Sequence, residues 1–207
     1  RPQPCPYLPA NRERKIVAEL ADGDAARRYE PLIRAGYRRS GAIAYRHACP
    51  ACRACIPVRI NIADFKPGKS LRRVRGQNSD LAVTILPALA RPDHFDLFRR
   101  YQEGRHGDGE MARMKERDYL DMIVSSPVDS TILEFRDSDD TLIGACLTDC
   151  LHDGYSAVYS FFDPRLSPRS PGTMMILWLI ERAREIGLPY VYLGFWIADC
   201  SKMSYKD

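Results

Sequence analysis

Three cysteines are spaced two residues apart in the run C-x-x-C-x-x-C from Cys49 to Cys55, and Cys5 lies near the start of the chain. Thiolates at this spacing can surround one metal ion or cluster, because the short loops between them turn the sulfur atoms inward. The run predicts zinc or an iron–sulfur cluster at Cys5, Cys49, Cys52 and Cys55, with His47 as an alternative fourth ligand. Free buried or redox-active thiols are the other interpretation.

A second chemical feature is a basic loop that leads into a helix start. Ser170 is typical of a helix N-cap, and a proline follows at the first helical position. The unpaired N–H groups of Gly172 and Thr173 would then face an anion, with Arg169 beside them. The six residues from Arg169 to Met174 resemble the Q/R-x-x-G-x-G/A signature that binds the coenzyme A pyrophosphate in the N-acetyltransferase (GNAT) superfamily. Met174 departs from it, and a capped helix packed on a sheet is the alternative.

A third feature is the pair His106 and Asp108 in a segment with two glycines. A histidine beside an aspartate in a loop can act as a general base. We therefore take both as candidate catalytic residues, with a hydrogen-bonded structural histidine as the alternative.

The surrounding chain alternates short apolar strands with helices. The residues 37–41 are expected to form a basic turn. Strands are predicted at 14–20, 42–46, 56–62, 80–86, 130–135, 142–151, 155–162 and 190–196. Helices are predicted at 24–35, 70–75, 93–105, 118–125 and 171–186.

The order of these elements predicts an α+β fold with two domains. Residues 87–207 follow the order of a GNAT-like acyltransferase domain: helix, helix, three antiparallel strands, helix and strand. Residues 1–86 form a smaller, basic α+β domain that contains the cysteine run, and 87–92 is the expected linker. We also expect that the C-terminal end of the second domain is truncated.

Charge is distributed unevenly along the 207 residues. Residues 1–80 hold 17 Lys or Arg and 7 Asp or Glu, whereas residues 81–207 hold 14 and 20. A balance of +10 against −6 favours a polyanionic partner on the first half, with a solvated basic face as the alternative. No apolar run approaches the roughly 20 residues of a membrane span, and no secretory leader is present, so a cytoplasmic protein is expected.

Several longer stretches together resemble one enzyme family. They are residues 5–9, 36–41, 45–46, 49–59, 100–101, 105–108, 156–164, 188–194 and 202–206. These stretches span nearly the whole chain and resemble the aminoacyl-tRNA–protein transferases, specifically the bacterial aspartate/glutamate leucyltransferases. The resemblance implies transfer of leucine from leucyl-tRNA to the N-terminal Asp or Glu of a protein in the N-degron pathway. It implies aminoacyl-tRNA and such protein N-termini as partners, and no cofactor is required for the reaction.

The implied substrates need three kinds of contact. The acceptor carboxylate needs a cation, ideally an arginine; the candidates are Arg38, Arg39 and Arg46, with Lys202 and Lys206 as a second set. The tRNA end needs phosphate contacts and a stacking surface; the candidates are Arg169, Ser170, Gly172, Thr173, Tyr159, Tyr192 and Trp196. The leucyl side chain needs an apolar pocket; the candidates are Phe161, Phe195 and Met203. Tyr205 joins the substrate-binding set, and Tyr159 and Phe161 join His106 and Asp108 as candidate catalytic residues.

Three alternative functions stay open at this point. The donor amino acid could be arginine, as in the related eukaryotic arginyltransferases. The chain could instead be a coenzyme A-dependent N-acetyltransferase, or a metal-containing regulator that binds nucleic acid without catalysis. The oligomeric state is open.

Overall fold

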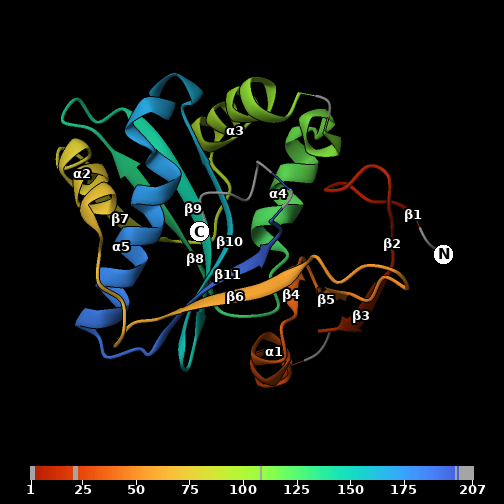
Figure 1. Cartoon of the computed structure of the whole chain (residues 1–207). Helices are drawn as coiled ribbons and strands as arrows, with labels where there is room; N and C mark the ends of the chain where they lie inside the picture. Colours follow the sequence, from red (N-terminus) through yellow and green to blue (C-terminus); the bar gives the residue numbers. More distant parts are fainter. Residues whose placement is uncertain (1–2, 21–22, 108, 199, 201–207) are drawn as a thin grey trace.

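The computed structural model describes residues 3–20, 23–107, 109–198 and 200, and its centre is a six-stranded mixed sheet (Figure 1). The strand order is β6-β11-β10-β9-β8-β7. The strands are β6 (Ile56–Asn61), β7 (Ala82–Pro87), β8 (Ser130–Arg136), β9 (Leu142–Leu151), β10 (Gly154–Phe162) and β11 (Tyr190–Trp196). Neighbours are antiparallel except β10 and β11, which are parallel because a helical crossover connects them.

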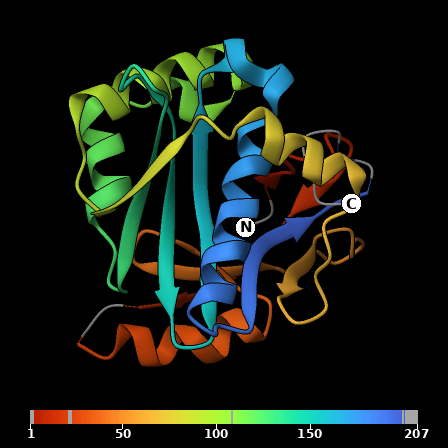
Figure 2. The same cartoon turned by 90° about the vertical axis from the view of Figure 1, so that its left-hand side faces the viewer.

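Helices cover both faces of this sheet (Figures 1 and 2). α3 (Pro92–His106) and α4 (Glu116–Val124) lie on one face, with the short 3-10 turn η1 (Glu110–Arg113) between them. α2 (Lys69–Gln77) and α5 (Pro171–Glu185) lie on the other, and α5 follows the 3-10 turn η2 (Pro164–Arg169). The predicted helices at these positions are confirmed. Their apolar faces and the sheet form the main core, in which side chains such as Phe98, Phe161 and Leu179 are fully buried.

The N-terminal part builds a smaller layer beside the strand ends. It contains β1 (Gln3–Pro4), β2 (Arg12–Glu13), β3 (Lys15–Glu19), α1 (Ala25–Arg34), β4 (Arg38–Ser40) and β5 (Ile43–His47). The last three strands form a sheet in the order β3-β5-β4, and α1 packs against it through a second apolar cluster. The mixed α and β character expected from the sequence is confirmed.

The turn expected at residues 37–41 is wrong in part. Arg38–Ser40 form strand β4, and glycines with positive φ lie on each side of it, Gly36 at 86° and Gly41 at 54°. The two arginines look like an exposed basic turn in the sequence. Their side chains find partners on the six-stranded sheet instead, and those contacts hold the segment extended.

The expected domain boundary after residue 86 falls between β7 and α3. Strands β6 and β7, which precede it, lie in the same sheet as four strands that follow it. The boundary stays a prediction. Among the described residues, no helix is long and apolar enough to cross a bilayer.

Candidate functional site

Strands β10 and β11 separate part-way along their length. Within the described chain, they pair only where residues 154–156 meet residues 190–192. The register of β10 against β9 shifts between Ala157 and Tyr159, and that of β11 against β6 shifts between Tyr192 and Gly194. Such irregularities bend a strand away from its neighbour. We call the resulting space between residues 157–159 and 193–194 the strand split.

The guanidinium of Arg38 fills the strand split. Its Nη1 donates to the carbonyl oxygen of Leu193 at 2.9 Å. Its Nη2 donates to the carbonyl oxygens of Ala157 at 3.1 Å and Val158 at 2.8 Å. Arg38 therefore joins the two strands where they part. None of the carboxylates in the described part of the chain forms an ion pair with it, and its printed partners are carbonyl oxygens, which carry no net charge.

Gly194 makes room for this guanidinium. Its φ is 78°, a left-handed conformation that favours glycine. A Cβ atom at this position would overlap the Nη1 and Cζ atoms of Arg38. The backbone of β11 can thus approach Arg38 only without a side chain at residue 194.

Arg38 shares a face of the three-stranded sheet with several rings. It pairs in register with Tyr45, and His47 lies two residues further along β5, so the three side chains point the same way. The His47 ring contacts Phe195 at 4.9 Å and Tyr7 at 5.9 Å between centroids. Burial lowers the pKa of His47, although Glu13 acts in the opposite direction. The face therefore presents Arg38 as a cation beside a neutral imidazole.

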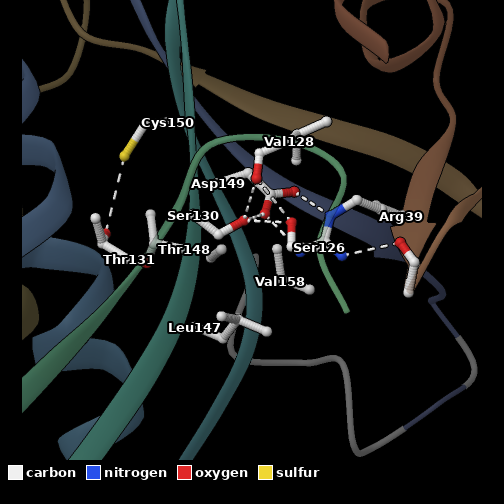
Figure 3. A network of polar contacts seen from close by, with 12 residues as sticks. Arg39, Ser126, Val128, Ser130, Thr131, Leu147, Thr148, Asp149, Cys150 and Val158 are labelled. Carbon is white, nitrogen blue, oxygen red and sulfur yellow. Dashed lines mark hydrogen bonds and ion pairs between the residues drawn. The ribbon is translucent and has the colours of Figure 1, made fainter. Parts of the chain in front are cut away.

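Arg39, the next residue, has a different environment (Figure 3). Its Nε and Nη2 donate to the two carboxylate oxygens of Asp149 at 2.8 and 2.6 Å, and both side chains are 0% exposed. Ser130 also donates to Asp149 at 2.7 Å and bonds to Ser126. The predicted role of Arg39 as a substrate-binding cation is not compatible with this burial. It forms a structural ion pair between β4 and β9.

Arg46 lies on the opposite face of β5 from Tyr45 and is exposed. Its guanidinium lies 5.4 Å from the centroid of the Tyr37 ring. Of the three arginines predicted to bind the acceptor carboxylate, Arg38 alone reaches the strand split.

The predicted anion site lies at the start of α5, where the Ser170 side chain forms no cap hydrogen bond within the described chain. Ser170 takes a left-handed conformation with φ 54°, and Pro171 is the first helical residue. The N–H groups of Gly172 and Thr173 lie in the first turn, where a helix offers them no internal acceptor. Arg169 forms an ion pair with Asp80, which leaves its side chain 27% exposed. The four predicted residues are therefore adjacent in space.

Tyr159 lies half-buried on β10, directly after the bulge. Gln102 Nε2 of α3 donates to its hydroxyl at 2.6 Å, and burial raises the pKa of Tyr159, so the phenol stays neutral at physiological pH. Gln102 Oε1 is buried and has no partner among the described residues. Phe161, in contrast, is 0% exposed and packs on Phe98 and Tyr119. It is a core residue and cannot touch a reacting group.

The other aromatic candidates on β11 differ in their contacts. Tyr192 is 5% exposed, donates to Asp153 at 3.0 Å and accepts from Arg59 at 3.4 Å, so its hydroxyl belongs to a structural network. Trp196 ends the strand and is half-buried.

His106 is the last residue of α3, and its ring meets Tyr101 edge-on at 5.5 Å. The remaining predicted residues, Asp108, Lys202, Met203, Tyr205 and Lys206, lie outside the described residues.

Two family models match the chain. The model described as the N terminus of arginine-tRNA-protein transferase matches residues 3–73, and the model described as its C terminus matches residues 93–207. The chain belongs to the arginine-tRNA-protein transferase family. Its members are transferases, and the resemblance inferred from the sequence motifs is confirmed.

Curated relatives agree with this family. An aspartate/glutamate leucyltransferase of Paramagnetospirillum magneticum is 55% identical over 205 residues, which cover 99% of this chain and 84% of the relative. One of Granulibacter bethesdensis is 49% identical over 204 residues, 99% of this chain and 76% of the relative. The solved structure of L-PGS from Bacillus licheniformis aligns with a TM-score of 0.53 at 11% identity, over 87% of this chain and 52% of that one. That likeness concerns the fold alone.

The predicted metal site of this family member is not supported. Within the described residues, no three His, Cys, Asp or Glu side chains are arranged to hold a metal ion. Backbone N–H groups of Leu8 and Arg14 donate to the sulfur atoms of Cys5 and Cys49, both at 3.4 Å. Burial, and then the nearby Cys5, Cys49 and Cys52, raise the pKa of the Cys55 thiol to about 11.

Three residues of this site are absent from the sequence-based predictions. Gly194 lies inside a predicted strand, where an isolated glycine is a known sign of a bulge or a close approach. Gln102 and Asp149 lie inside a predicted helix and a predicted strand. No local signal marks them, because their partners are distant in the sequence.

Proposed function

We propose that this protein transfers leucine from leucyl-tRNA to the N-terminal Asp or Glu of an acceptor protein. Family membership supports transfer from an aminoacyl-tRNA. The names of the curated relatives support leucine and the acidic acceptors. The observation that carries the acceptor assignment is the Arg38 guanidinium, which lies half-buried in the strand split without a carboxylate partner among the described residues.

In this proposal Arg38 binds the side-chain carboxylate of the acceptor residue. An arginine has five N–H groups, and three of those of Arg38 donate to carbonyl oxygens, so two have no partner among the described residues. The three carbonyls also fix the direction of the guanidinium, so little entropy is lost when a carboxylate binds. His47, neutral beside it, does not add a competing charge.

The donor end lies at the start of α5. Phosphate oxygens accept from the N–H groups of Gly172 and Thr173, and Arg169, paired with Asp80, lies beside them. Tyr159 lies directly after the bulge of β10, at the strand split, and its hydroxyl accepts a hydrogen bond from Gln102.

The chemical step needs no ATP, because the donor is an activated ester. The acceptor nitrogen forms a bond to the ester carbonyl carbon, and the bond from that carbon to the terminal ribose oxygen breaks. The nitrogen loses one proton and the ribose oxygen gains one. An α-amine has a reference pKa near 8, so a useful fraction is already free at neutral pH. Positioning by Arg38 and the α5 start then supplies much of the rate.

The decisive experiment offers radiolabelled leucyl-tRNA and two peptides that differ only in their first residue, Asp or Ala. Label is expected on the Asp peptide alone. A parallel reaction with arginyl-tRNA tests the second candidate donor, which the description of the family models favours. Absence of transfer from either tRNA to either peptide would refute the proposal.

A further inference from the structure

The basic segment around α2 has no role in the proposed site. Residues 65–79 contain five cations, Lys66, Lys69, Arg72, Arg73 and Arg75, and no Asp or Glu. On α2, Leu71 and Val74 point to the core. The cationic side chains flank this apolar stripe and are exposed.

The positive charge of α2 is largely uncompensated. In the part of the chain that the structure describes, Lys69 and Arg73 form no ion pair, and Arg75 lies 3.7 Å from Glu181 with its side chain 62% exposed. The neighbouring helix α5 differs, since Arg182 pairs with Glu185 at 3.1 Å and Arg184 with Glu181 at 2.9 Å. The acids of α5 are thus used by its own arginines. A helix whose exposed cations outnumber their carboxylate partners favours a polyanion.

A groove of about 490 Å³ runs between α2, α5 and β7. Leu71, Met174, Leu177 and Trp178 give it an apolar floor. Arg72, Arg75 and Arg182 line its rim, together with Glu181 and Glu185. The Trp178 ring packs edge-on against Phe135 at 6.3 Å and is half-buried, so part of it faces the groove. A cationic rim beside a partly exposed aromatic ring is a pattern that binds single-stranded nucleic acid.

The C-terminal end of α2 touches Arg169, the last residue of the turn η2 that precedes α5. Asn78, which ends α2, donates through Nδ2 to the carbonyl oxygen of Arg169 at 2.8 Å. Asp80 then pairs with the Arg169 side chain. A nucleic-acid backbone bound along α2 would therefore reach the start of α5 at its end.

We propose that α2 and the groove beside it bind the acceptor end of tRNA. The phosphates lie on Lys69, Arg72, Arg73 and Arg75, an unstacked base of the single-stranded 3′ end lies against Trp178, and the terminal nucleotide continues to the start of α5. This inference rests on the proposed function, because it takes aminoacyl-tRNA as the substrate. We prefer RNA to a peptide as the occupant because the groove has an excess of positive charge. Arg72 and Arg75 of α2 line its rim, whereas the rim acids Glu181 and Glu185 are already paired with arginines of α5.

The first test removes two exposed cations that make no hydrogen bond or ion pair within the described chain. In the double variant Lys69→Ala/Arg73→Ala, the affinity for uncharged tRNA is expected to fall about tenfold at low salt. The slope of log affinity against log salt should become shallower by about 2, roughly 1 for each phosphate contact removed. The loss should appear in the KM for tRNA rather than in kcat. Arg27→Ala/Arg28→Ala on α1 removes the same charge and should change neither quantity.

The second test uses the groove itself. The chain has two tryptophans, so in a Trp196→Phe variant the tryptophan fluorescence comes from Trp178 alone. A short single-stranded RNA with the 3′-terminal tRNA sequence is expected to quench its fluorescence, and an Asp-initiated peptide is not. Quenching by the peptide instead would assign the groove to the acceptor protein and overturn the inference.

Two results separate this inference from the proposed function. Equal tRNA affinity for the α2 and α1 double variants, with leucyl transfer intact in the unmodified protein, would refute the α2 surface alone. Failure of transfer by the unmodified protein, with the α2 effect on tRNA binding still present, would refute the proposed reaction and leave the RNA surface standing.

Discussion

Arg38 and Arg39 are neighbours on β4, yet their guanidinium groups meet opposite kinds of partner. Arg39 is fully buried and gives two hydrogen bonds to Asp149, so its charge is cancelled by a carboxylate. Arg38 is half-buried and gives three hydrogen bonds to backbone carbonyls, which are dipoles without net charge. The first arrangement fixes the position of the strand. The second fixes an arginine and leaves its charge available.

The type of partner distinguishes a structural arginine from one that can bind a substrate: a carboxylate in the first case, backbone carbonyls in the second. A buried ion pair is costly to break, because either charge alone would remain in a medium of low dielectric constant. A guanidinium held by carbonyls keeps a full positive charge that attracts an anion from solution. Arg39 therefore anchors β4, and this anchor places Arg38 in the strand split.

The largest expected effect comes from breaking the compensated pair. Asp149→Asn leaves the Arg39 charge buried without a counter-charge and should lower the free energy of unfolding by about 3–5 kcal/mol. Urea unfolding followed by circular dichroism measures this. Glu103→Gln is the matched control, because Glu103 and Arg99 form an exposed pair with side chains 64% and 57% exposed. That change should cost less than about 0.5 kcal/mol. Equal costs would show that the buried pair contributes no more than a surface pair.

Changes at Arg38 should affect activity more than stability. In Arg38→Ala, transfer to the Asp peptide should fall about 10- to 100-fold, the range expected for losing a charge-assisted contact. Arg38→Lys should recover little, since an ammonium cannot bridge three fixed carbonyls and a carboxylate. The measurement is kcat/KM on Asp and Ala peptides. Arg46→Ala, on the opposite face of β5, should change it less than about threefold. A loss of the same size at Arg46 would contradict the distinction between the two.

A substitution at Gly194 tests the role of Arg38 without changing the arginine itself. Gly194→Ala should displace the Arg38 guanidinium and lower kcat/KM on the Asp peptide about tenfold, a smaller loss than in Arg38→Ala because the charge remains nearby. Gly187→Ala is a matched control, because Gly187 has the same φ of 78° and no heavy atom lies within 4 Å of the place that a Cβ would occupy. Both changes cost about 1–2 kcal/mol of backbone strain. If Gly187→Ala lost as much activity, strain rather than Arg38 would explain the effect.

The smallest expected effect is a pH dependence on the Arg38 face. Burial lowers the pKa of His47 in the folded protein, so the unfolded chain binds its proton more readily. The stability that neutral His47 contributes is full above its unfolded pKa near 6.5 and is lost as the pH falls below that value. His47→Gln, which stays neutral, should flatten the unfolding free energy between pH 7 and pH 5. An unchanged pH slope would show that His47 is not the group responsible.

Local features of the sequence predicted most elements well. The apolar and β-branched run at 155–162 corresponds to β10, and Ser170 with the proline after it marks the start of α5. These signals are local, because a strand or helix start depends on residues within a few positions. The family could be predicted too, because each of its motifs is a short stretch of neighbouring residues that can be read without the fold.

The sequence alone determined most of the elements, their order and the family, since periodicity, capping residues and motifs are properties of short stretches. It also offered Arg38, Arg39 and Arg46 as three equivalent cations. Only the tertiary structure separated them. Asp149 lies 110 positions from Arg39, and Leu193 lies 155 positions from Arg38. Whether an arginine meets a carboxylate or a carbonyl depends on which strands fold against it, and no pattern within β4 contains that information.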